Sequence, residues 1–250
     1  RKVSSVMYFE KSWVCSKLDT QNSKWNNKNL LVFVDEKSDT ATLEYFRKKQ
    51  NSKVVLVKEG TEYKAQNESS YIINPLSYSH CQKLFNDLGN KGLLPDGIIY
   101  FWPASSTETD IETDIETDRL VRYLDESFKG EGFYSVFNIL RALRSLKIPK
   151  QFIYAYSREN GVHDFLAGAA APLSRSLQMF FPGMLFKTVE LKTSGESLEE
   201  RLNKLVEEYN YGTSLQEQEI RYESGIRYIP SIIPYKTEVQ DSLPIKEGGV

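Results

Sequence analysis

Short apolar runs rich in β-branched residues alternate along this chain with longer segments of helical periodicity, and this alternation limits the possible folds most strongly. The strand-like runs are residues 30–34, 53–57, 71–73, 97–102, 151–156 and 185–191. The helix-like segments are residues 39–50, 77–88, 115–146 with a break near Gly130, 164–180 and 197–209. Parallel neighbours in a sheet need crossover connections, which helices usually supply. The pattern predicts an α/β, Rossmann-like fold with a mainly parallel sheet flanked by helices.

The two ends of the sequence carry strand patterns without helices between them. Residues 6–14 form one such run, and residues 215–233 form a pair of runs around a turn signal at 223–225. We therefore expect β extensions at both ends, the second a hairpin. No long linker interrupts residues 1–250, so a single domain is the simplest organisation.

Charge and cysteine content exclude several classes of protein. Thirty-two Lys and Arg against 34 Asp and Glu leave a net charge of −2, without the basic excess that nucleic-acid binding needs. No apolar run reaches the ~18 residues of a membrane span. Cys15 and Cys81 form neither a disulfide framework nor a C-x-x-C pair. We expect a cytoplasmic protein with no nucleic-acid or membrane partner.

Residues 107–118 are a short acidic repeat in which Glu-Thr-Asp-Ile occurs twice before a final Glu-Thr-Asp, with six acidic residues in twelve. Carboxylates two positions apart resemble a calcium loop, but the central glycine and terminal glutamate of such a loop are missing. Dense like charges stay solvated, so an exposed loop is predicted.

Signatures of nucleotide binding and reduction are absent or misplaced. A dinucleotide site needs a glycine-rich turn after the first core strand, whereas residues 35–39 are acidic and contain no glycine. The GEGFYS run at 130–135 follows helical sequence instead of a strand. Tyr45 and Lys49 have the spacing of a reductase tyrosine and lysine, but one such match is expected by chance.

Candidate nucleophiles and metal ligands also lack partners. His163 and Asp164 have no G-x-S-x-G nucleophile in the sequence, and Asp164 is better placed as a helix cap. His80 and Cys81 are adjacent on a predicted helix and so face different sides of it. The sequence therefore predicts no catalytic, cofactor-binding or metal-binding residue in this chain.

Several motifs, in their order along the chain, resemble the structural subdomain of the ketoreductase domain of bacterial modular polyketide synthases whose acyltransferases act in trans. They are YFEKSW at 8–13, KVVLVKEG at 53–60, YIINP at 71–75, LPDGIIYFW at 94–102, RSL at 175–177, KTVE at 187–190 and EIRYESGIRY at 219–228. The resemblance covers nearly the whole chain. Pro172 departs from it by interrupting a helix that usually runs on, and Phe180 or Phe181 stands where an acidic residue is usual.

The resemblance implies a non-catalytic half with a truncated Rossmann-like fold. The NADPH loop and the catalytic residues would lie in a second half. The KEGGV sequence at 246–250 would stand just before that loop. That half would reduce β-keto groups tethered to acyl carrier protein through phosphopantetheine. Two alternatives stay open: a module of an inactive reductase that docks carrier proteins or neighbouring synthase domains, and a free-standing Rossmann-like NAD(P) enzyme.

The resemblance also implies an interface with the catalytic half. The segment that leads toward the second half contains five apolar or aromatic residues within eight positions: Tyr228, Ile229, Ile232, Ile233 and Tyr235. We expect this segment to contact the catalytic half, although the same residues could instead close the core of this domain.

Deleting two units of the acidic repeat, residues 108–115, should shift the melting temperature by only a few degrees, because surface loops change length at small entropic cost. Differential scanning calorimetry of the wild type and the deletion measures the shift. A large loss of stability, or stabilisation by calcium of the wild type alone, would contradict the loop assignment.

Overall fold

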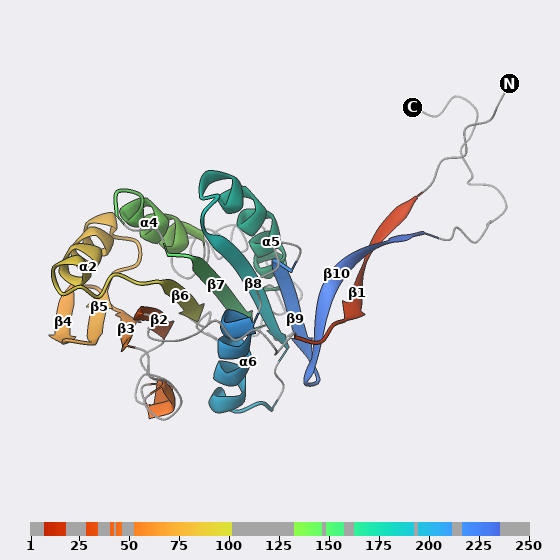
Figure 1. The fold of residues 1–250 in the computed structure, drawn as a ribbon, viewed down its shortest axis with the longest axis horizontal. Helices are drawn as coiled ribbons and strands as arrows, with labels where there is room; N and C mark the ends of the chain where they lie inside the picture. Colours follow the sequence, from red (N-terminus) through yellow and green to blue (C-terminus); the bar gives the residue numbers. More distant parts are fainter. Residues whose placement is uncertain are drawn as a thin grey trace, which may run out of the picture.

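The residues that the structure describes are organised around one sheet of ten strands (Figure 1). The computed structural model describes residues 8–18, 29–34, 41–42, 44–46, 53–101, 133–146, 149–157, 163–192, 195–211 and 217–235. The strands are β1 (Phe9–Cys15), β2 (Asn29–Val34), β3 (Lys53–Glu59), β4 (Lys64–Asn67), β5 (Ser70–Ile73), β6 (Gly97–Phe101), β7 (Gln151–Ser157), β8 (Leu185–Lys192), β9 (Glu219–Glu223) and β10 (Ile226–Pro234). Their order across the sheet is β1-β10-β9-β8-β7-β6-β2-β3-β5-β4.

The central strands, from β5 through β3, β2, β6, β7 and β8 to β9, are all parallel. The chain enters at β2, moves outward through β3 and β5, returns to β6 and then moves outward on the other side. This is the strand order of a doubly wound Rossmann fold, with its switch point between β2 and β6. The predicted α/β class is therefore confirmed.

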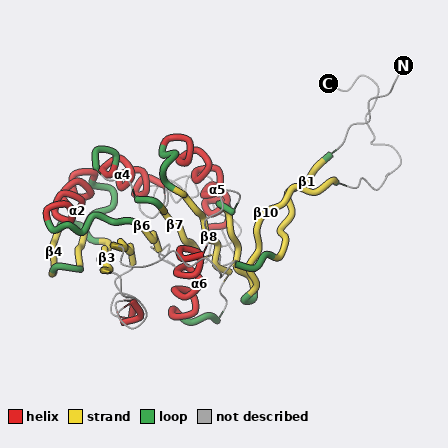
Figure 2. Tube along the Cα trace, in the orientation of Figure 1, coloured by secondary structure: helices red, strands yellow, loops and turns green. Residues whose placement is uncertain are grey.

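Helices cover both faces of this sheet, as Figure 2 shows. One face carries α2 (Tyr78–Asn90), α4 (Phe133–Leu143) and α5 (His163–Phe180), and the other carries α6 (Leu198–Tyr211) with helical residues around Tyr45. Successive residues of a strand point to opposite faces of the sheet. Leu31 packs on the face that carries α2, α4 and α5, and Val32 packs on the face that carries α6. Burial on both faces explains why these runs are apolar at consecutive positions.

The fold is abbreviated between β3 and β5. These two strands are parallel, yet residues 60–69 join them without a helix. Within this connection β4 runs antiparallel to β5 and forms the end of the sheet. The sequence predicts a turn at 58–61 that opens an edge hairpin over residues 62–64. That pairing is wrong, because β3 already lies between β2 and β5 and the added strand pairs with β5.

The helices follow the sequence closely where they are described. Ser197 and Glu200 form the predicted capping box: the Glu200 N–H donates to Ser197 Oγ, and the Glu200 carboxylate accepts from the Ser197 N–H. Helix α5 runs through Pro172 without a break, since tertiary packing of Leu173 and Leu177 holds the turns that follow. The acidic repeat at 107–118, Gly130 and the side chains of His163 and Asp164 lie outside the described residues.

The hairpin expected within 215–233 is confirmed, since β9 and β10 pair antiparallel around a turn at Ser224 and Gly225. Its first strand, however, is not an extension. Strand β9 pairs parallel with β8 and completes the main sheet, so β10 alone is the added C-terminal strand. Strand β10 pairs with β9 only as far as Tyr228 and then continues with β1 as a two-stranded ribbon. We call this ribbon, β1 with residues 228–235, the arm; it projects away from the helices and sheet (Figure 1).

Replacing Gly97 by alanine should destabilise the fold by about 1–3 kcal/mol through overpacking. A Cβ there would lie 1.8 Å from the Tyr209 hydroxyl of α6, in the buried core. Gly183→Ala is the matched control, because its Cβ would meet nothing within 4 Å. Urea unfolding compares the free energies of the three proteins; equal values would refute the close approach of α6 to β6.

Candidate functional site

The switch point is where a Rossmann fold binds dinucleotides, at the carboxyl ends of its central strands. Here those ends are Val34 of β2 and Phe101 of β6, which are paired with each other. The residues that follow Val34 are the acidic, glycine-free run 35–39, which lies outside the described residues. In sequence, this run directly follows the strand at the switch point, and its acidic, glycine-free composition is unsuited to binding a pyrophosphate.

Tyr45 is a core residue in this structure. Its ring is buried in the layer beneath α6, and its hydroxyl donates a hydrogen bond to Asn203 Oδ1 at 2.8 Å. Burial, with the charges of Glu207 and Glu199, raises the pKa of Tyr45 to about 12. A catalytic tyrosine needs the opposite shift. Lys49 lies outside the described residues.

The cysteines and His80 are also structural or isolated. Burial in the core raises the pKa of Cys81 to about 12, which removes its thiolate at neutral pH. His80 Nδ1 accepts the Asn74 N–H at 3.1 Å, while Cys15 is exposed on β1. Within the described residues no three His, Cys, Asp or Glu side chains cluster as a metal site would require.

None of the helices described is long and apolar enough to cross a membrane.

The five residues expected at an interface all lie on the arm, four in β10 and Tyr235 just after it. None belongs to either core cluster of the described residues. The exposed fraction is 75% for Ile232 and 50% for Tyr235. Because strand side chains alternate, Tyr228 and Ile232 point to one face of the arm and the other three to the opposite face. The expected cluster is therefore divided between two surfaces.

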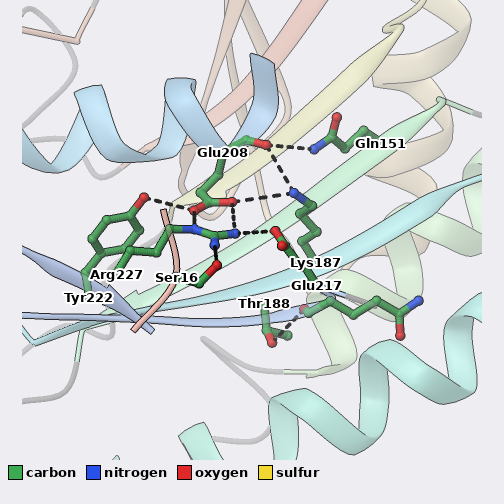
Figure 3. A network of polar contacts seen from close by, with 9 residues as sticks. Ser16, Gln151, Lys187, Thr188, Glu208, Glu217, Tyr222 and Arg227 are labelled. Carbon is green, nitrogen blue, oxygen red and sulfur yellow. Dashed lines mark hydrogen bonds and ion pairs between the residues drawn. The ribbon is translucent and has the colours of Figure 1, made fainter. Parts of the chain in front are cut away.

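The arm is fastened to the body by a buried polar network beneath α6 (Figure 3). Arg227, at the start of β10, donates to both carboxylate oxygens of Glu208 on α6 and to Glu217 at 2.7 Å. Its guanidinium also donates to Ser16 Oγ, directly after β1, at 3.1 Å. One side chain thus joins both strands of the arm to a helix of the body.

Glu208 is the centre of this network. Its carboxylate also accepts from the Tyr222 hydroxyl at 2.9 Å, and its carbonyl, in the last turn of α6, accepts from Lys187 Nζ at 3.2 Å and Gln151 at 3.4 Å. The side chains of Glu208 and Lys187 are fully buried. Burial lowers the pKa of Lys187, opposed by the charge of Glu208, and burial with Glu208 raises the pKa of Tyr222. A lysine at this end of the helix also complements the helix dipole.

A second set of contacts holds the opposite face of the arm. The Arg221 guanidinium on β9 stacks over the Trp13 ring at 4.0 Å and bonds Glu190 of β8 at 2.9 Å. Lys11 of β1 pairs with Glu219 of β9, which also pairs with Arg175 of α5 at 3.3 Å. The base of the arm is therefore fixed on both faces, and its direction is set by the body.

Sequence reasoning missed this anchor, although a signal for it exists. The strand-like run at 185–191 is mostly apolar, which predicts that helices cover both of its faces. Lys187 and Glu190 are charged residues within this run. Charges inside such a strand are buried and so must be paired. That argument predicts partners for both, but it does not identify Glu208, Arg221 or Arg227.

Glu208→Gln should lower the free energy of unfolding by about 3–5 kcal/mol, because it removes the buried carboxylate that pairs with both Arg227 and Lys187. The control is Glu223→Gln, which removes the exposed pair of Glu223 with Lys192 and should change stability by less than about 1 kcal/mol. Urea unfolding at neutral pH measures both. Equal effects would show that the buried network is not an anchor.

Three solved structures that share this fold are, or include, a reductase. An "N-terminal ketoreductase from macrolactin assembly line" has a TM-score of 0.69 and 14% identity over 92% of this chain and 45% of its own. A multidomain structure of a "keto acid-selecting NRPS module" that includes a ketoreductase has a TM-score of 0.70 and 19% identity, over 91% of this chain and 18% of its own. A short-chain dehydrogenase/reductase mutant from Serratia marcescens has a TM-score of 0.54 and 13% identity over 79% of this chain and 97% of its own.

This chain thus spans less than half the length of the first two structures. Comparison with curated proteins gives no match. A family model described as "Beta-ketoacyl synthase-like, N-terminal" matches residues 28–208, from just before β2 to α6. That match covers most of the sequence, and the chain belongs to this beta-ketoacyl synthase-like, N-terminal family.

Proposed function

We propose that this chain is the non-catalytic structural half of a ketoreductase in a bacterial modular polyketide synthase of the type with acyltransferases that act in trans. The observation that carries the proposal is a doubly wound sheet in which the strand at the switch point, β2, is followed by an acidic, glycine-free sequence. Such a chain keeps the reductase fold but is unsuited to bind the cofactor.

The reaction would belong to a second half of the same polypeptide. That half would bind NADPH and transfer its hydride to the carbonyl carbon of a β-ketoacyl group held on acyl carrier protein by phosphopantetheine; a proton delivered to the carbonyl oxygen completes the β-hydroxyacyl product. The lengths of two ketoreductase structures support this division, because this chain covers only 45% and 44% of them. The role of this chain would be to support that second half.

A reductase assignment also suits the cysteines better than the synthase named in the family description. Covalent acyl transfer at a cysteine needs a reactive thiolate. Cys81 is buried with a raised pKa, and Cys15 lies on the exposed arm. Neither is placed as a nucleophile, and these are the two cysteines of the chain.

The test is to express this chain and the catalytic half as separate polypeptides in one cell. The two should purify as a complex that oxidises NADPH with a model β-ketothioester. Ile232→Asp with Ile233→Asp should weaken the complex at least tenfold, because charge would be buried at an apolar contact. Glu62→Gln with Glu68→Gln, a pair of exposed changes at the opposite edge of the sheet, is the control.

NADPH titration of the isolated chain separates this proposal from a free-standing enzyme. Fluorescence or calorimetry should detect no binding in the micromolar range. Micromolar affinity would overturn the assignment of a non-catalytic half, and folded halves that do not associate would reduce the role of this chain to a covalent tether.

A further inference from the structure

The two ends of the sheet differ in how they expose their hydrogen-bonding edges. At one end β4 is only four residues long, and Lys64 stands in it. Short edge strands and lysines are devices that prevent another strand from pairing. At the other end β1 is seven residues long and has no proline. Its two charged residues, Glu10 and Lys11, have opposite signs.

Two flanking hydrogen bonds fix which backbone groups of the arm point outward. The Ser16 N–H donates to the Arg227 carbonyl at 3.0 Å, and the Tyr235 N–H donates to the Tyr8 carbonyl at 2.7 Å. In an antiparallel ladder, hydrogen-bonded pairs alternate with pairs whose N–H and C=O groups point away from each other. The pairs with outward groups are therefore Phe9 with Pro234, Lys11 with Ile232, Trp13 with Pro230 and Cys15 with Tyr228.

The outer edge of β10 is protected along the arm. Beyond Tyr228 no described strand pairs with this edge, and two of its next three outward positions are Pro230 and Pro234. Proline has no N–H, and within sheets it is confined to edges, where it prevents strand addition.

The outer edge of β1 has no such protection. The N–H and C=O groups of Phe9, Lys11, Trp13 and Cys15 point away from β10, and no strand of the described residues lies on that side. The Lys11 ammonium pairs with Glu219 and lies 5.0 Å from the centre of the Trp13 ring, so it is held over the face of the sheet instead of across the edge. The arm is thus closed to pairing on one edge and open on the other.

We propose that the open edge of β1 accepts an extended segment of the catalytic half as an added strand. This inference rests on the proposed function and specifies how the two halves would join. Strand addition gives affinity through main-chain hydrogen bonds and specificity through alternate side chains. The catalytic half is a suitable partner, because more than half of each of two similar ketoreductase structures has no counterpart in this chain. The exposed Phe9 of β1 would flank the new strand on one face.

Proline substitutions on the two edges test the proposal with a matched control. Lys11→Pro removes an outward N–H of β1, and Ile232→Pro removes the outward N–H of its cross-strand partner on β10. Each is compared with the alanine variant at the same position, which removes the side chain alone. Calorimetric titration against the catalytic half should show Lys11→Pro binding about tenfold or more weaker than Lys11→Ala, which corresponds to roughly one lost hydrogen bond. Ile232→Pro should bind within about twofold of Ile232→Ala.

Residue-resolved amide hydrogen exchange gives a second test. It uses the wild-type chain, so its result does not depend on whether a variant folds. Complex formation should slow exchange at Phe9, Lys11, Trp13 and Cys15, and leave the inward amides of Glu10, Ser12 and Val14 unchanged. Equal effects of proline on both edges, or no new protection on β1 in the complex, would overturn strand addition. Protection of β1 in a dimer of this chain alone would also overturn it, in favour of a second copy. Failure of the folded wild-type halves to associate would instead count against the supporting role proposed above and reduce this chain to a covalent tether.

Discussion

The structure depends on one buried carboxylate, that of Glu208. It lies between two basic side chains, Lys187 of the central sheet and Arg227 at the start of β10, and none of the three side chains is more than 5% exposed. A buried charge is tolerated only when it is paired and hydrogen-bonded, so the three groups require one another. The contacts connect α6, β8 and the start of β10, three elements that are separate in the sequence. A variant that changes one of them affects all three.

This anchor explains how a Rossmann-like sheet can carry a projecting ribbon. Arg227 and Arg221 hold opposite faces of the arm at its base, one through Glu208 and the other through Trp13 and Glu190. Beyond that base β1 and β10 pair only with each other among the described strands. An isolated two-stranded ribbon is marginally stable in water. A partner that covers the arm would supply the missing stabilisation, and this is the role that we propose for the catalytic half.

The sequence predicts the main sheet well because its signal is local. A strand covered on both faces is apolar at consecutive residues, and β2, β6 and β7 follow that rule. Pairing between β1 and β10 could not be predicted in this way, since more than 200 residues separate Ser16 from Arg227. The buried Lys187 was detectable as a charge in an apolar run, but its partner on α6 was not. The alternation of Ile232 and Ile233 across the arm follows from strand periodicity alone, once residues 226–234 are known to be one strand.

We propose that this chain supports a reductase without taking part in the chemistry. The most direct measurement is the turnover of separately purified catalytic half, with NADPH and a β-ketothioester, as this chain is added in increasing amounts. We expect turnover that rises with added chain and becomes constant at an equimolar ratio, while the chain alone is inactive. Turnover that is independent of the added chain would contradict it.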